Sequence, residues 1–136
     1  MQAVAVFNIA ARYAMSWQTP PALEMRFDEK IVIRGRATAF TNPAIEAGIM
    51  HCRALLEFLG LRCDRKDPAR LAQRLGKMED DFVIEDFVGP SGPLSKVSVE
   101  QALMPYPGPK EEAEMALASV IHAANKGIAH MTSAHD

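Results

Sequence analysis

The chain has 136 residues, the size of one ordinary domain, and we expect a single domain over residues 1–136. Hydrophobic residues make up 49% of it and charged residues 24%, a composition that excludes an intrinsically disordered chain. The formal net charge of −2 excludes the whole-chain basic field that is typical of many nucleic-acid-binding domains.

The first segment is apolar and reads MQAVAVFNIAARYAMSW. It lacks the basic start of a signal peptide, and Arg12 interrupts it, so we expect a soluble, cytoplasmic protein that does not enter a membrane. The apolar spacing predicts a helix over residues 3–17, which the Pro20-Pro21 pair ends. The apolar stripe of this helix consists of Val6, Ile9, Ala10, Tyr13 and Trp17.

Residues 22–41 fit two patterns. Leu23, Met25 and Phe27 alternate as in a strand. Leu23 and Phe27 also continue to Ile31 at a spacing of four residues, as on one side of a helix. We predict a helix here because the neighbouring segments are helical.

A second clear helix is predicted over residues 43–60. Asn42 can cap its first turn, Pro43 fits that turn, and Gly60 is a common helix end. The apolar face of this helix is formed by Ile45, Ile49, Cys52, Leu56 and Leu59.

The middle of the chain carries its charges in two blocks. Residues 62–77 are mainly basic, and a short helix is predicted from Asp67 to Gly76. Residues 79–86 hold five acidic residues and no basic residue, with apolar residues among them. We therefore expect the acidic block to dock on the rest of the protein.

Residues 89–109 contain eight glycines and prolines, a density of helix breakers that predicts a long crossover loop with one turn at residues 97–104. The last helix begins near Lys110. Its apolar stripe matches that of residues 43–60, so we expect the two helices to pack together. These elements predict an all-α fold, a helical bundle of four to five helices. The stripe of the last helix consists of Leu117, Ile121, Ala124, Ile128 and Met131.

The two cysteines, Cys52 and Cys63, do not form a CxxC pair, which excludes a zinc site made of cysteines. Cys52 lies on the predicted apolar face, where a thiol packs as a small hydrophobe. We expect both to be free thiols in a reduced, intracellular protein.

Polar residues that could do chemistry lie beside both apolar stripes. His51 and Arg53 flank the face of the 43–60 helix, where Arg53 is expected to pair with a carboxylate. The acids of residues 79–86 could bind a hard cation, but ion pairs with Arg53 or with residues 62–77 are favoured. On the last helix, the polar residues spaced at i, i+4 and i+8 are His122, Lys126 and His130.

Three blocks of the sequence, HCRALLEFLG (51–60), EDDFVIEDF (79–87) and NKGIAHMT (125–132), resemble those of small uncharacterised bacterial helical proteins. Those proteins in turn resemble the HEPN superfamily. The resemblance implies a helical bundle that often forms a homodimer and often binds or acts on RNA or nucleotides.

Active HEPN ribonucleases carry an arginine, then a polar residue, and a histidine five positions after the arginine. In this chain, the resemblance places His130 at the histidine position, Asn125 at the arginine position and Lys126 next to it. Arg53 or Lys126 could replace the missing arginine in space.

The sequence therefore predicts a HEPN-like binding module without catalysis, for RNA, a nucleotide or a partner protein, and no cofactor. One alternative is a metal-independent ribonuclease in which His130 is the general acid and base. Another is a metal site of carboxylates and histidines, formed by His51, His130, Asp81 and Glu85. The candidate binding residues are His51, Asp80, Asp81, Glu85 and Asp86.

Overall fold

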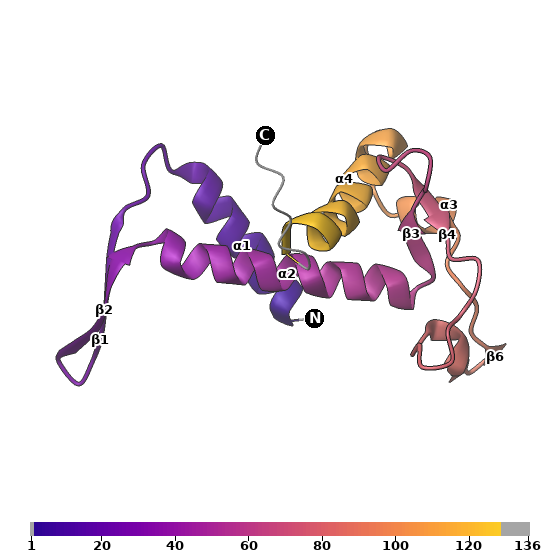
Figure 1. Ribbon diagram of the computed structural model, residues 1–136, viewed down its shortest axis with the longest axis horizontal. Coiled ribbons are helices and arrows are strands. Elements are labelled where there is room, and N and C mark those ends of the chain that lie inside the picture. Colours follow the sequence, from indigo (N-terminus) through magenta and orange to yellow (C-terminus); the bar gives the residue numbers. More distant parts are fainter. Residues whose placement is uncertain (1, 129–136) are drawn as a thin grey trace. The chain divides into compact units, whose positions relative to one another are not determined.

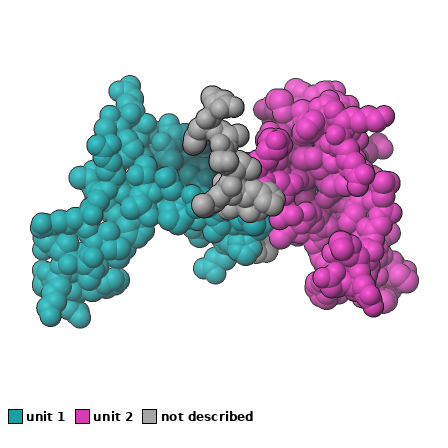
Figure 2. Space-filling model, in the orientation of Figure 1, with its two compact units in different colours: residues 1–51 teal, residues 52–136 magenta. Residues whose placement is uncertain are grey.

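The computed structural model describes residues 2–128 of the chain (Figure 1). The chain divides into two compact units, unit 1 over residues 1–51 and unit 2 over residues 52–136 (Figure 2). The long helix α2, Thr38–Phe58, contributes residues to both units.

Unit 1 begins with helix α1, Gln2–Ser16, which confirms the predicted first helix to within one residue at each end. Two strands follow, β1 at Ala22–Phe27 and β2 at Lys30–Arg36, and α2 then starts at Thr38. Phe7 of α1 lies so close to α2 that a Cβ atom on Gly48 would overlap its side chain. Glycine at this position therefore allows the two helices to approach each other.

The prediction of a helix over residues 22–41 is wrong for most of that range, because β1 and β2 form an antiparallel hairpin. Asp28 and Glu29 form its two-residue turn and both have positive φ, 45° and 65°, as the hairpin turns that match strand twist require. The strand-like alternation from Leu23 was thus the correct pattern. A bulge lies between Met25 and Arg26.

Unit 2 contains the end of α2 and a succession of short elements. The strands pair as two further antiparallel hairpins, β3 with β4 and β5 with β6. Helix α4 lies against both β3 and β4. The elements are β3 (Leu61–Cys63), β4 (Leu71–Gln73), η1 (Ile84–Asp86), β5 (Val88–Gly89), β6 (Gly92–Pro93), α3 (Val99–Leu103), α4 (Lys110–Ala123) and η2 (Ala124–Ile128).

The prediction of an all-α bundle is wrong, because the described residues form three small antiparallel sheets in addition to the helices. The helix predicted from Asp67 to Gly76 is replaced by the β3–β4 hairpin. The carboxylate of Asp64 accepts the backbone N–H groups of Lys66 and Asp67 at 2.7 and 3.2 Å. These bonds favour a turn over a helix, since a short polar side chain competes for backbone donors.

The predicted loop over residues 89–109 does contain its one helical turn, α3. Ser98 and Gln101 form a capping box there, in which each side chain accepts the backbone N–H of the other residue. The β5–β6 pair, which the sequence pattern did not predict, lies at the start of this range.

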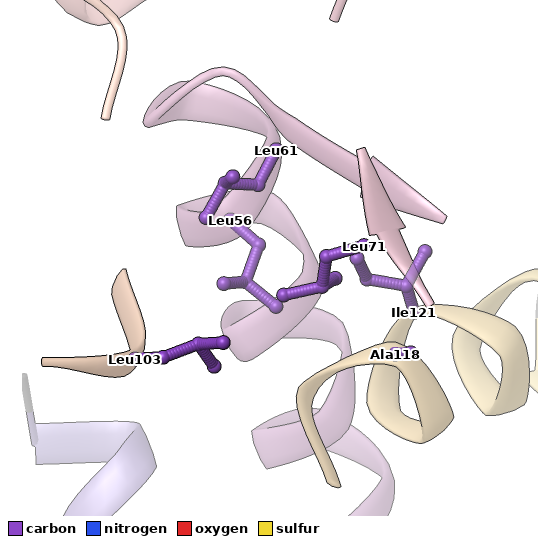
Figure 3. Close-up of a cluster of buried hydrophobic side chains, with 6 residues drawn as sticks. All are labelled: Leu56, Leu61, Leu71, Leu103, Ala118 and Ile121. Carbon is purple, nitrogen blue, oxygen red and sulfur yellow. The ribbon is translucent and has the colours of Figure 1, made fainter. Parts of the chain in front are cut away.

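The hydrophobic core of unit 2 joins the end of α2, the β3–β4 hairpin, α3 and α4 (Figure 3). Leu61 and Ile121 are its largest fully buried side chains. The last helix was expected to pack against the 43–60 helix. Both helices contribute side chains to this cluster, but α4 contacts mainly the strands β3 and β4. The buried members are Leu56, Leu61, Leu71, Leu103, Ala118 and Ile121.

Candidate functional site: an arginine cleft in unit 2

A polar cavity with convergent charged groups lies in unit 2 and has a volume of about 440 Å³. Arg53 from α2, Arg62 from β3 and Arg74 after β4 line it, and we call it the arginine cleft. Glu57 and Asp81 are the acidic residues of its lining. Segments far apart in the sequence thus bring three guanidinium groups to one cleft.

Arg53 is held by its own helix. Its Nη2 atom donates to Oε1 of Glu57, one helical turn later, at 2.8 Å. This ion pair confirms the prediction that Arg53 pairs with a carboxylate. The Nε–H group of Arg53 is buried and has no hydrogen-bond partner among the described residues, which leave part of its donor capacity unused.

Arg74 is held by a network around the carboxylate of Glu85. Its Nη2 atom donates to both oxygens of Glu85 at 3.0 and 3.1 Å, and its Nη1 atom donates to the carbonyl of Gly76. Lys96 donates to the Arg74 carbonyl at 3.0 Å and lies 3.8 Å from Glu85. As in Arg53, the buried Nε–H group of Arg74 finds no partner within residues 2–128.

Arg62 is anchored to the backbone of the β3–β4 hairpin. Its Nε atom donates to the carbonyl of Gln73 at 3.1 Å, and its Nη1 atom donates to the carbonyl of Cys63 at 2.9 Å. No carboxylate contacts this guanidinium among the described residues, so its charge is the least compensated of the three.

The acidic residues 79–86 mainly bind basic side chains and backbone donors. The ion pairs Arg74–Glu85 and Lys77–Asp86 confirm the prediction that this block pairs with residues 62–77. The Lys77 bond, followed by the N–H of Val83, lowers the pKa of Asp86 below its ordinary value. Asp81 accepts the N–H of Met78 at 2.8 Å.

Aromatic rings also line the cleft. Phe58 and Phe82 belong to its lining, and their ring centroids lie 6.3 Å apart. Phe87 contacts both rings edge to face, at 5.7 Å from Phe58 and 5.1 Å from Phe82. Phe82 is nonetheless 72% exposed, so much of its ring is accessible beside the arginines.

The residues singled out from the sequence do not all meet in this cleft. Arg53 and Asp81 line it, and Glu85 joins it through Arg74. Asp80 is exposed and outside the lining. His51 is an exposed residue of unit 1.

The residues of the HEPN-like motif lie elsewhere or beyond the described residues. Asn125 is half-buried and Lys126 is exposed in η2, and neither lines the cleft. His130 lies outside the described residues. Its roles in the ribonuclease and metal-site alternatives therefore stay predictions. Within residues 2–128, no three His, Cys, Asp or Glu side chains gather as a metal site.

Sequence reasoning missed Arg62, Arg74 and Phe82 as parts of one site. The basic block of residues 62–77 was recognised, but a helix was predicted within it. Arg62 instead pairs with Ala72 across the β3–β4 hairpin. That pairing brings the two ends of the basic block together. Three-residue strands carry too little alternation to reveal it.

Both cysteines are free thiols, as predicted. Burial raises the pKa of each thiol above its ordinary value. The Sγ atom of Cys63 lies 3.3 Å from the carbonyl oxygen of Ala118, to which it donates. These thiols are therefore poor nucleophiles, because the reactive thiolate form is disfavoured.

No protein-family model, curated protein or solved structure matches this chain. The likeness to HEPN proteins therefore remains a resemblance of three short sequence blocks. Among the helices that the structure describes, none has both the length and the apolar character needed to cross a membrane.

Proposed function

We propose that the protein is a non-catalytic binding module that holds the phosphate of a nucleotide in the arginine cleft. One observation carries the proposal: Arg53, Arg62 and Arg74 converge on a single cleft, and two of them have a buried N–H that no described residue binds. A guanidinium presents paired donors that match the oxygens of a phosphate, which makes arginine a preferred residue for phosphate recognition.

The carboxylates beside the cleft support binding by fixing the guanidinium groups. Glu57 and Glu85 each hold one arginine through Nη2, which leaves other N–H groups of the same side chains for a ligand. An unsatisfied buried donor costs about 1–3 kcal/mol. A small rotation of Arg53 or Arg74 toward an anion would recover part of that cost.

The exposed ring of Phe82 supports a nucleotide over a bare phosphate. A base that stacks on an aromatic side chain gains about 1–3 kcal/mol, whatever the identity of the base. The cleft volume of about 440 Å³ falls within the range of small-molecule sites. The phosphate of a nucleotide would thus contact the arginines while its base stacks on Phe82.

The proposal assigns no reaction to the cleft. Its described lining offers arginines and carboxylates, but no histidine, the side chain best suited to proton transfer near neutral pH. General acid–base catalysis favours a group whose pKa lies close to the working pH. The lining therefore favours holding a ligand over transforming it.

Calorimetric titration of the full chain with AMP, ATP and a short oligoadenylate RNA tests this proposal at low and high salt. We expect binding at low salt that weakens as salt increases. Arg53→Gln and Arg62→Gln should each weaken it about tenfold, since a hydrogen bond to a charged group contributes about 1.5–3 kcal/mol. Phe82→Ala should weaken AMP binding but not the binding of inorganic phosphate.

The matched control is Arg65→Gln, which removes an exposed charge of the same basic block outside the cleft lining. Equal losses in Arg65→Gln and Arg62→Gln would indicate a general charge effect and contradict the site. Absence of binding to all three ligands at low salt would reject the proposal. RNA cleavage that His130→Ala abolishes would replace it with the ribonuclease alternative.

A further inference from the structure

Among the described residues, helix α1 of unit 1 leaves three large side chains of its apolar stripe about half exposed. Val6, Ile9 and Tyr13 lie at helical spacing, yet they are 47%, 58% and 60% exposed. Among the described residues of unit 1, the only buried apolar side chains are the small ones of Ala10 and Ala37. Unit 1 therefore lacks a core of large side chains of its own.

Strand β2 of the β1–β2 hairpin is exposed as well. All seven residues of β2 are exposed, including the β-branched run Ile31 to Ile33. Because successive side chains of a strand point to opposite faces, both faces of β2 are exposed within residues 2–128. A hairpin of two strands is only marginally stable in water unless it packs against something.

We propose that unit 1 is a homodimerisation unit and that the same unit of a second copy covers the α1 stripe and the hairpin. Nine large apolar side chains of unit 1 are exposed. Large side chains bury about 150–250 Å² each, so nine that are about half exposed offer at most roughly 900 Å². Because Val32 faces away from Ile31 and Ile33, a partner must contact both faces of the hairpin to bury all of this area. A standard protein interface buries about 800 Å² on each partner. The nine are Val6, Ile9, Tyr13, Met15, Phe27, Ile31, Val32, Ile33 and Phe40.

The charges of unit 1 favour a second copy over a strongly charged partner. Residues 1–51 carry five basic and four acidic side chains, so the unit is nearly neutral. In a two-fold dimer each patch faces a copy of the same surface, and a surface of one strong sign would repel itself. On the hairpin, Glu24 pairs with Arg26 and Arg34 within the chain. The arginine cleft lies in unit 2, so this inference is independent of it.

Sedimentation equilibrium of the full chain at micromolar concentrations tests the inference. We expect the mass of two chains. Ile9→Glu and Val32→Glu should each raise the dimer Kd at least about tenfold, because each places a charge in the covered surface. Far-UV circular dichroism checks that each variant is folded, and Val32→Glu, on an exposed strand, decides the matter if Ile9→Glu does not fold.

The matched control is Leu75→Glu, since Leu75 is 84% exposed but belongs to unit 2. This variant should dimerise like the wild type. A wild type that sediments as one chain at every concentration would overturn the inference, as would a Leu75→Glu loss equal to that of Val32→Glu.

Discussion

Glu114 joins the helix α4 to strand β4 in unit 2. Its side chain is buried, and its Oε1 atom accepts the backbone N–H of Leu71 at 2.9 Å. Its Oε2 atom lies 3.4 Å from Nε of Arg70. A carboxylate is rarely buried without partners, and these two account for its burial.

Replacing this carboxylate tests how much the contact stabilises the fold. Glu114→Ala leaves the N–H of Leu71 unpaired within the core, so we expect the free energy of unfolding to decrease by about 1–3 kcal/mol. Urea denaturation measures the change. Glu111→Ala, an exposed change in the first turn of α4, is the control, and equal effects of the two would contradict this role for Glu114.

Asp86 makes stability depend on pH in the acidic range. Its pKa lies below the ordinary value of 3.8 because Lys77 and the N–H of Val83 bind the charged form. A lowered pKa stabilises the folded state above 3.8, and this contribution is lost as the pH falls below that value. Asp86→Asn should therefore lower Tm at neutral pH, and the Tm difference from the wild type should disappear at acidic pH.

Thermal unfolding at a series of pH values measures this difference. Asp80→Asn is the control, because Asp80 is exposed and no bond to its side chain is seen among the described residues. A Tm difference for Asp86→Asn that stays constant from neutral to acidic pH would show that the charge of Asp86 is not the cause.

At the scale of elements, the long helices were predictable and the hairpins were not. The periodic stripes of α1, α2 and α4 extend over three turns or more, enough to establish a period. The β1–β2 turn, Asp28-Glu29, lacks the Asn-Gly pair that usually signals a hairpin. The three-residue strands β3 and β4 are set by contacts with α4, and such contacts leave no local pattern.

The same turn predicts a stabilising substitution. Glu29 has a φ of 65°, a conformation that glycine adopts without the cost of about 1 kcal/mol borne by other residues. We expect Glu29→Gly to slow amide hydrogen exchange in β1 and β2. Lys30→Gly, one residue later and outside the positive-φ positions, should speed that exchange. Faster exchange in Glu29→Gly would contradict the turn geometry.

At the scale of the molecule, part of the candidate site was predictable. Arg53 and Asp81 both line the cleft. They could be recognised because a charged residue beside an apolar helix face, or within an acidic block, shows in the order of residues alone. Arg62 and Arg74 could not be linked to them, since the link runs through the β3–β4 hairpin and the core behind it. The two compact units were not foreseen either, because one helix, α2, belongs to both.

The distribution of two residue types gives each unit its own natural reporter. The single tryptophan, Trp17, belongs to unit 1, whereas both thiols, Cys52 and Cys63, belong to unit 2. Cys63 is half-buried and donates to the carbonyl of Ala118, so we expect it to react faster with a thiol reagent when this contact opens. Indole fluorescence and thiol labelling therefore follow the opening of the two units separately in the unmodified chain, without any introduced dye.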